Sequence, residues 1–125
     1  MEKYQYILEY DLPPPATSDE IAQVRNACDQ HGTASLGRSA KESVSRWRIP
    51  EAQLRGAIIR HIIQGKRMFR KYKDDFSGDL IPRDVQANVT LPVGFDVYVE
   101  AALMEEGMII IYAHDHTPRK LRLPQ

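Results

Sequence analysis

Apolar and polar residues alternate at the start of the chain, which predicts a β-strand. Residues 4–12 place mostly tyrosine and leucine on one side and mostly polar residues on the other, the period-two pattern of a strand with one buried face. Three consecutive prolines, residues 13–15, follow at once. Proline has no backbone N–H for a strand ladder, so we expect the strand to end there.

A helical pattern replaces the alternation at residues 18–31 and predicts a short amphipathic helix. Its start has the residues of a capping box, with Thr17 at the N-cap and Glu20 at the third helical position. Gly32 is a typical residue for the C-terminal end of a helix. The apolar stripe of this helix consists of Ile21, Val24 and Cys28.

The next stretch of the chain has a weaker pattern. Residues 33–41 have no clear period, and we interpret them as a loop. Residues 43–49 alternate, which predicts a short strand. Arg46 and Arg48 share one side of that strand and would make it strongly basic.

A second helix is predicted to begin at Pro50, because proline is favoured at the first position of a helix. Gly65 interrupts the apolar stripe of this helix. We therefore expect the helix either to bend there or to stop and restart at Lys66. The stripe consists of Leu54, Ile58, Ile62, Phe69 and Tyr72, widened by Ile59 and Ile63.

The last third of the chain predicts consecutive strands. Residues 76–83 are rich in turn-forming residues, and residues 84–91 alternate cleanly. Two further strands, 95–104 and 108–114, lie on either side of Glu-Glu-Gly at 105–107, which is typical of a hairpin. This part of the chain therefore predicts neighbouring antiparallel strands.

The predicted elements follow the order β-α-β-α-β-β-β and indicate an α+β fold. We expect an antiparallel or mixed sheet of about four to five strands with two helices packed on one face. The length of 125 residues fits one domain. We place that domain at residues 1–117 and expect an irregular C-terminal tail at 118–125.

The composition, 42% hydrophobic and 27% charged, is that of a globular protein and excludes a disordered chain. Cys28 is the only cysteine, so no disulfide can form within the chain. The first residues lack the basic start and apolar run of a signal peptide. The longest nearly apolar stretch, residues 108–113, is far too short to span a bilayer. We therefore expect a small cytoplasmic protein without a membrane segment.

The net charge of zero conceals a segregation of charge along the chain. Residues 36–73 contain eleven lysines and arginines and only two acidic residues, whereas the segments 1–35 and 74–107 are net acidic. Aromatic residues are interleaved with the cations, a mixture that suits phosphates and unpaired bases. The leading hypothesis is a non-catalytic protein that binds nucleic acid or another polyanion. The alternative is a solvated face whose charges meet the acidic segments. The candidate binding residues are Arg46, Trp47, Arg48, Lys66, Arg67, Arg70, Lys71 and Lys73.

The sequence His114-Asp115-His116 indicates a different kind of site. Two histidines on one side of a strand could bind a metal, but no HExxH or CxxC spacing supplies further ligands. We therefore predict no metal and no cofactor. Histidine, lysine and arginine can also cleave RNA through its own 2′-hydroxyl. A metal-independent, ribonuclease-like enzyme is thus an alternative function. Its candidate catalytic residues are His114, His116, Arg119, Lys120 and Arg122.

A third possible function is that of a protein-interaction module, such as an inhibitor or immunity-type protein, whose separated charges match a partner surface. Asp96 and Glu100 flank Tyr98 on the outward side of their predicted strand. Such a pair is more typical of a solvated sheet face than of acid–base catalysis. Residues 108–114 are apolar on both faces, which favours a homodimer that covers the second face.

Overall fold

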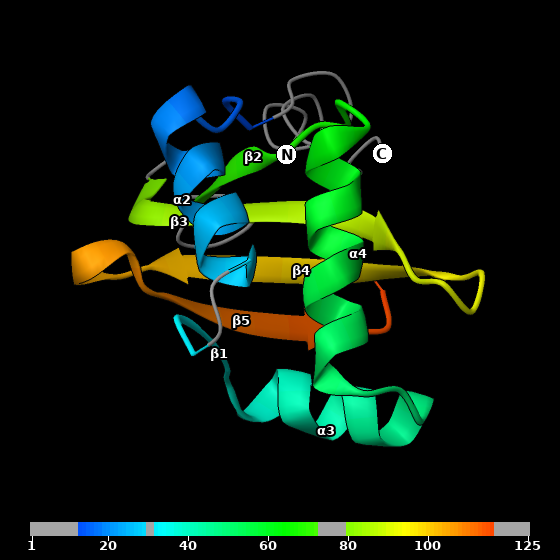
Figure 1. The fold of residues 1–125 in the computed structure, drawn as a ribbon. Coiled ribbons are helices and arrows are strands. Elements are labelled where there is room, and N and C mark those ends of the chain that lie inside the picture. The colour runs from blue at the N-terminus through cyan, green and yellow to red at the C-terminus, as the bar shows by residue number, and fades with distance from the viewer. Residues whose placement is uncertain (1–12, 30–31, 73–79, 117–125) are drawn as a thin grey trace, which may run out of the picture.

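The computed structural model describes residues 13–29, 32–72 and 80–116, which form a layer of helices on a five-stranded sheet (Figure 1). The helices are α2 (Ser18–Asp29), α3 (Arg38–Trp47), α4 (Glu51–Ile63) and the short 3-10 helix η1 (Glu105–Gly107). The strands are β1 (Ala34–Leu36), β2 (Phe69–Tyr72), β3 (Leu80–Thr90), β4 (Asp96–Leu103) and β5 (Ile109–His114). The predicted strand at 4–12 and the predicted tail at 118–125 lie outside the described residues.

The sheet is mixed and has the strand order β1-β5-β4-β3-β2. β1 runs parallel to β5, and the other neighbouring pairs are antiparallel. α2 and α4 lie across one face of the sheet, and α3 packs against β1 and β5 (Figure 1). The predicted α+β class, with a mixed sheet and two helices on one face, is therefore confirmed. α3 is an additional helix that the sequence pattern did not predict.

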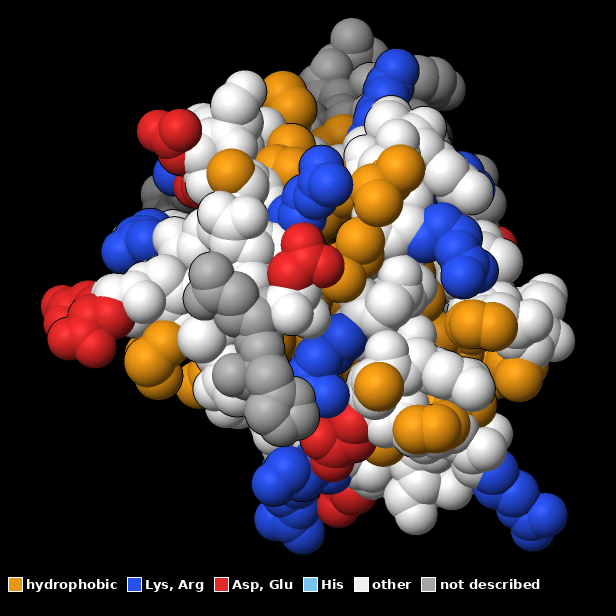
Figure 2. All heavy atoms as spheres, viewed as in Figure 1, with side chains coloured by type: hydrophobic (Ala, Val, Ile, Leu, Met, Phe, Trp, Pro, Cys, Tyr) orange, Lys and Arg blue, Asp and Glu red, His pale blue; other side chains and the backbone are white. Residues whose placement is uncertain are grey.

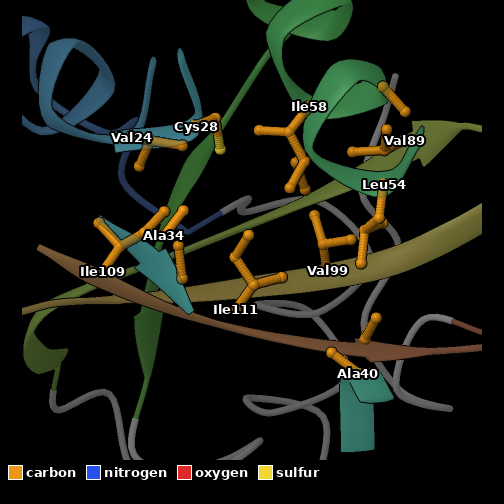
Figure 3. Packing of buried hydrophobic residues seen from close by; sticks show 14 of the residues in the cluster. Val24, Cys28, Ala34, Ala40, Leu54, Ile58, Val89, Val99, Ile109 and Ile111 are labelled. Atoms are coloured by element: carbon orange, nitrogen blue, oxygen red, sulfur yellow. The ribbon is translucent and has the colours of Figure 1, made fainter. Parts of the chain in front are cut away.

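The core lies between the sheet and the layer formed by α2 and α4 (Figure 3). Alternate residues of the three long strands point into it, as the period-two pattern predicts. These strand residues are Val85, Ala87, Val89, Val97, Val99, Ala101, Ile109, Ile111 and Ala113. Val24 and Cys28 join them from α2, and Leu54 and Ile58 join them from α4. Since each buried Val, Leu or Ile side chain contributes about 1.5–3 kcal/mol, these contacts hold the helices on the sheet.

The start of α2 confirms the predicted capping box. The backbone N–H of Thr17 donates to Glu20 Oε1 at 2.8 Å, and the backbone N–H of Glu20 donates to Thr17 Oγ1 at 3.1 Å. Each side chain thus satisfies a backbone group that the first turn of a helix leaves without a partner. The helix begins at Ser18, the residue where the prediction placed its start.

The end of α4 differs from its prediction. Gly65 adopts a φ of 72°, and the N–H of Lys66 donates to the His61 carbonyl oxygen at 3.1 Å. This hydrogen bond is that of a Schellman motif, which ends a helix. The expectation that the helix bends at Gly65 or restarts at Lys66 is wrong, because residues 69–72 pair with β3 as strand β2.

The region between α2 and α4 also differs from its prediction. β1 and the first residues of α3 occupy the predicted loop at 33–41, and the rest of α3 occupies the predicted strand at 43–49. Both interpretations are wrong. Ala40, Val44 and Trp47 recur at spacings of four and three residues and pack on the core, so the apparent alternation is part of a helical stripe.

Candidate functional site

The structure divides the predicted basic segment between the two edges of the sheet. Arg46, Trp47 and Arg48 lie at the end of α3, the helix that packs against β1 and β5. Residues 66–71 precede or belong to β2, the strand at the opposite edge. On the face that carries α2 and α4, Lys and Arg side chains are scattered among apolar ones and do not form one patch (Figure 2). Lys73 lies outside the described residues.

Arg46 and Trp47 are bound to the end of β5. Trp47 Nε1–H donates to Asp115 Oδ1 at 2.6 Å, and Arg46 Nη2 donates to the same oxygen at 3.0 Å. The hydrogen bond from Trp47 and then that from Arg46 lower the pKa of Asp115. The Trp47 ring also lies edge-on to Phe95, with ring centroids 6.0 Å apart. Of this group Arg48 is exposed and takes part in none of the ion pairs found in the described ranges.

Arg70 and Lys71 are also paired, each with a carboxylate on a different element of the fold. Arg70 Nε lies 3.4 Å from Glu20 Oε2 on α2. Lys71 Nζ lies 2.8 Å from Glu100 Oε2 on β4. Since each cation already faces a carboxylate, these two residues add little positive charge to a ligand-binding surface.

A pocket of about 230 Å³ lies at the C-terminal end of α4, and we call it the α4 pocket. It is lined by Ala57, Arg60, His61, Gln64, Lys66, Thr90 and Leu91. Arg60 is exposed and Lys66 is half-buried, and Arg67, the next residue in the chain, is exposed. Among the residues that the structure describes, no ion pair involves any of these three cations. Their charges therefore remain available to a ligand.

A hydrogen bond from the His61 side chain on α4 holds the segment that contains Lys66 and Arg67. Its side chain is buried, and its Nε2 lies 2.8 Å from the Arg67 carbonyl oxygen. Because that oxygen can only accept, Nε2 carries the hydrogen, and Nδ1 is a buried acceptor without a partner in the described part of the chain. Burial lowers the pKa of His61, and the charge of Lys66 lowers it further against the opposing effect of the Arg67 hydrogen bond. The neutral imidazole is thus a positioning residue for the two cations.

The face of the sheet away from α2 and α4, which we call the outer face, carries a chain of polar side chains. The Tyr98 hydroxyl lies 2.6 Å from Gln86 Oε1 and 2.7 Å from Glu100 Oε2. Gln86 Nε2 donates to the Arg70 carbonyl oxygen at 3.1 Å, and Lys71 completes the chain through Glu100. A hydroxyl has one proton, so Tyr98 donates to only one of the two oxygens at a time.

His114 and Asp84 flank this chain. Tyr98 and His114 are register partners on β4 and β5, and their rings stack with centroids 6.3 Å apart and 27° between the planes. Burial raises the pKa of Asp84 on β3, although the charge of Lys71 opposes the shift. His114 is exposed, whereas Tyr98 is almost fully buried. On the outer face, the accessible imidazole of His114 therefore stacks on the buried ring of Tyr98.

Of the other catalytic residues predicted from the sequence, none that the structure describes takes part in the α4 pocket or in the polar chain on the outer face. His116 is exposed, and Arg119, Lys120 and Arg122 lie outside the described residues. In the described ranges, no group of three or more His, Cys, Asp or Glu side chains could hold a metal ion. No helix within those ranges is long and apolar enough to cross a membrane.

Sequence reasoning missed Arg60 and His61 as site residues, although a signal for His61 was present. Leu54, Ile58 and His61 recur at spacings of four and three residues, and all three are buried, so the same stripe that predicts α4 places an imidazole on its inner side. Arg60 had no such signal, because its role depends on the pocket that β3 closes.

The contact between the side chains of Gln86 and Tyr98 on the outer face could not be predicted from the periodicity of either strand. Twelve residues separate the two, and their contact depends on the register of β3 against β4. The chain matches no family model, no curated protein and no solved structure.

Proposed function

We propose that this protein binds polyanions through Arg60 and Lys66, which line the α4 pocket, and Arg67, the residue that follows Lys66. The observation that supports the proposal is that Arg60 and Lys66 line one pocket, that Arg67 follows Lys66 in the chain, and that none of the three takes part in an ion pair within the described ranges. Phosphate-bearing polymers attract such a group because each neutralised phosphate releases condensed counterions. Single-stranded nucleic acid is the polyanion we infer, because its backbone can follow a short, irregular surface.

Two local features hold the cations in place before a ligand arrives. The turn at Gly65 directs the chain back across the end of α4, and the hydrogen bond from His61 to the Arg67 carbonyl fixes the segment that follows. A surface whose backbone is already ordered loses less conformational entropy when it binds. The proposal therefore does not require a loop to become ordered on binding.

The proposal uses only part of the basic segment identified from the sequence. Four of its eight candidate residues form a hydrogen bond or an ion pair with a carboxylate, and binding a phosphate would compete with those contacts. They are Arg46, Trp47, Arg70 and Lys71. Arg60, which the sequence did not single out, replaces them as a ligand-facing cation.

The salt dependence of binding tests the proposal. Three neutralised phosphates give a slope of about −2 for log K against log salt, since single strands contribute about 0.7 per contact. Affinity for a short, labelled single strand should then fall about twentyfold between about 0.05 and 0.2 M salt. In the variant Arg60→Gln, Lys66→Gln, Arg67→Gln, measured by fluorescence anisotropy, we expect most of this dependence to disappear.

A control variant of equal charge separates a local site from a general effect of net charge. Arg25→Gln, Arg38→Gln, Lys41→Gln removes three exposed cations from α2 and α3, outside the α4 pocket. It should keep nearly the full affinity and slope of the wild-type protein. If both variants lose affinity equally, or if the wild-type protein does not bind at low salt, the proposal is refuted.

A further inference from the structure

The polar chain on the outer face is held largely out of solvent. The Glu100 and Lys71 side chains are only 17% and 27% exposed, and Gln86 and Tyr98 are almost fully buried. A partly buried ion pair is often no more stabilising than well-packed apolar side chains of similar size. Folding stability alone therefore does not explain why Glu100 and Lys71 occupy these positions.

The contacts on the outer face leave particular atoms available to a ligand. Both contacts described for the Glu100 carboxylate end on Oε2, which leaves Oε1 to accept a proton from a bound molecule. His114 is exposed, and its ring is oriented by the Tyr98 ring beneath it. The register makes Glu100 and His114 diagonal neighbours on β4 and β5. Such neighbours are about 7–8 Å apart, a separation that can accommodate one phosphodiester group.

The outer face offers a proton acceptor, a proton donor and a cation, and the hydroxyl that contacts the acceptor, that of Tyr98, is too deeply buried to attack a substrate. The register partners of Glu100 are Gln86 and Tyr112, and the partner of His114 is Tyr98. Among these described neighbours there is no serine, threonine or cysteine. A substrate with its own nucleophile suits this arrangement, and RNA has one in the 2′-hydroxyl next to each phosphodiester.

We propose that the outer face is a catalytic site that cleaves RNA, with Glu100 as the proton acceptor and His114 as the proton donor. Glu100 Oε1 removes the proton of a 2′-hydroxyl, the 2′-oxygen bonds to the adjacent phosphorus, and the bond from phosphorus to the 5′-oxygen breaks. Protonated His114 gives its proton to the leaving 5′-oxygen. The products are a 2′,3′-cyclic phosphate and a 5′-hydroxyl. Glu100 loses its negative charge when it accepts the proton of the 2′-hydroxyl, so its ion-pair partner Lys71 can then stabilise the negative charge that develops on the phosphate oxygens.

Tyr98 and Gln86 act as positioning residues in this site. Tyr98 contacts Glu100 through its hydroxyl and His114 through its ring, so one buried side chain orients both groups that exchange protons. Gln86 holds the Tyr98 hydroxyl from β3. The site lies on the sheet face opposite the helices and shares no residue with the α4 pocket, so cleavage and polyanion binding can be measured separately.

Cleavage of a labelled RNA by the purified protein, in the presence of a chelator, tests this proposal. The wild-type protein should release products that end in a 2′,3′-cyclic phosphate and should leave DNA of the same sequence intact, because DNA lacks the attacking hydroxyl. Glu100→Gln and His114→Ala should each lower the turnover rate about a hundredfold or more, the usual effect of losing a general base or acid.

A matched control separates the loss of a catalytic group from a general effect of substitution on the same strand, and loss of activity in the site variants excludes a contaminating ribonuclease. Asp96→Asn changes an exposed carboxylate on the same strand, which accepts a hydrogen bond from the Thr90 hydroxyl at 2.6 Å and lies outside the proposed site. Purified in the same way, it should cleave like the wild-type protein. If Glu100→Gln does not fold, Glu100→Asp keeps the carboxylate, withdraws it by one methylene group and should still lower the rate.

Three outcomes would overturn the assignment: no cyclic phosphate from the wild-type protein, full activity in Glu100→Gln, or loss of activity in His116→Ala but not in Glu100→Gln. The last result would move the activity from the sheet face to the end of the chain. None of them changes the expected salt dependence of binding at the α4 pocket, so the two proposals fail independently.

Discussion

Two glycines, Gly37 and Gly56, should respond in opposite directions to the same substitution. A Cβ atom on Gly37 would lie 2.5 Å from Cε1 and 2.8 Å from Cδ1 of Tyr112, distances that side chains do not tolerate without movement. Gly37 has a φ of −72°, so alanine fits its backbone and the clash with the ring is the main penalty. At Gly56, inside α4, a Cβ atom would meet nothing within 4 Å.

The sizes of the two effects follow from packing and helix propensity. Overpacking of this kind destabilises by about 1–3 kcal/mol, whereas alanine in place of glycine inside a helix stabilises by about 0.5–1 kcal/mol. With a urea m-value of about 2 kcal/mol/M, Gly37→Ala should lower the unfolding midpoint by about 0.5–1.5 M. Gly56→Ala should raise it by about 0.25–0.5 M. The fluorescence of Trp47, the only tryptophan, reports the transition.

A double-mutant cycle identifies the contact responsible. Tyr112→Leu removes the ring, so Gly37→Ala should cost clearly less in that background than in the wild-type protein, with a coupling energy of about 1 kcal/mol or more. Midpoints that move in the same direction for the two glycine variants would refute the reasoning. A coupling energy near zero would show that Tyr112 is not the group that meets the new methyl.

Two further predictions concern buried titratable groups. Burial lowers the pKa of His61 below its ordinary value of 6.5, so the unfolded chain binds more protons in that range, and stability should fall as the pH drops below about 6.5, by at most about 1.4 kcal/mol per pH unit. Urea unfolding at several pH values should show that the free energy of unfolding falls less steeply below about pH 6.5 in His61→Gln than in the wild-type protein. An equal pH dependence in the two proteins would contradict the prediction. Burial raises the pKa of Cys28 to about 12, so its thiol should react with a disulfide reagent at pH 8 far more slowly in the native protein than in denaturant. Equal rates in the two states would mean that the thiol is accessible.

Some interactions between residues close in the sequence could be predicted from the sequence alone. The capping box joins Thr17 and Glu20, three residues apart, so its chemistry is visible without a fold. The alternation at 84–91 and the hairpin around 105–107 are likewise local, and the structure contains strands and a turn at these places. Such patterns succeed because each face of the element is specified by its own residues.

Only the tertiary structure decided which faces those elements present and which charges meet. Trp47 belongs to a helix because its stripe finds the core beside β5, and no local feature of residues 43–49 reveals that neighbour. Lys71 pairs with Glu100 because β2 and β4 both border β3, an arrangement set by strand order. The sequence therefore determined the basic composition of the central segment. Folding neutralised part of that charge, because ion pairs between distant residues form only once the sheet brings them together. Within the part of the chain that the structure describes, it left Arg60, Lys66 and Arg67 without an ion pair.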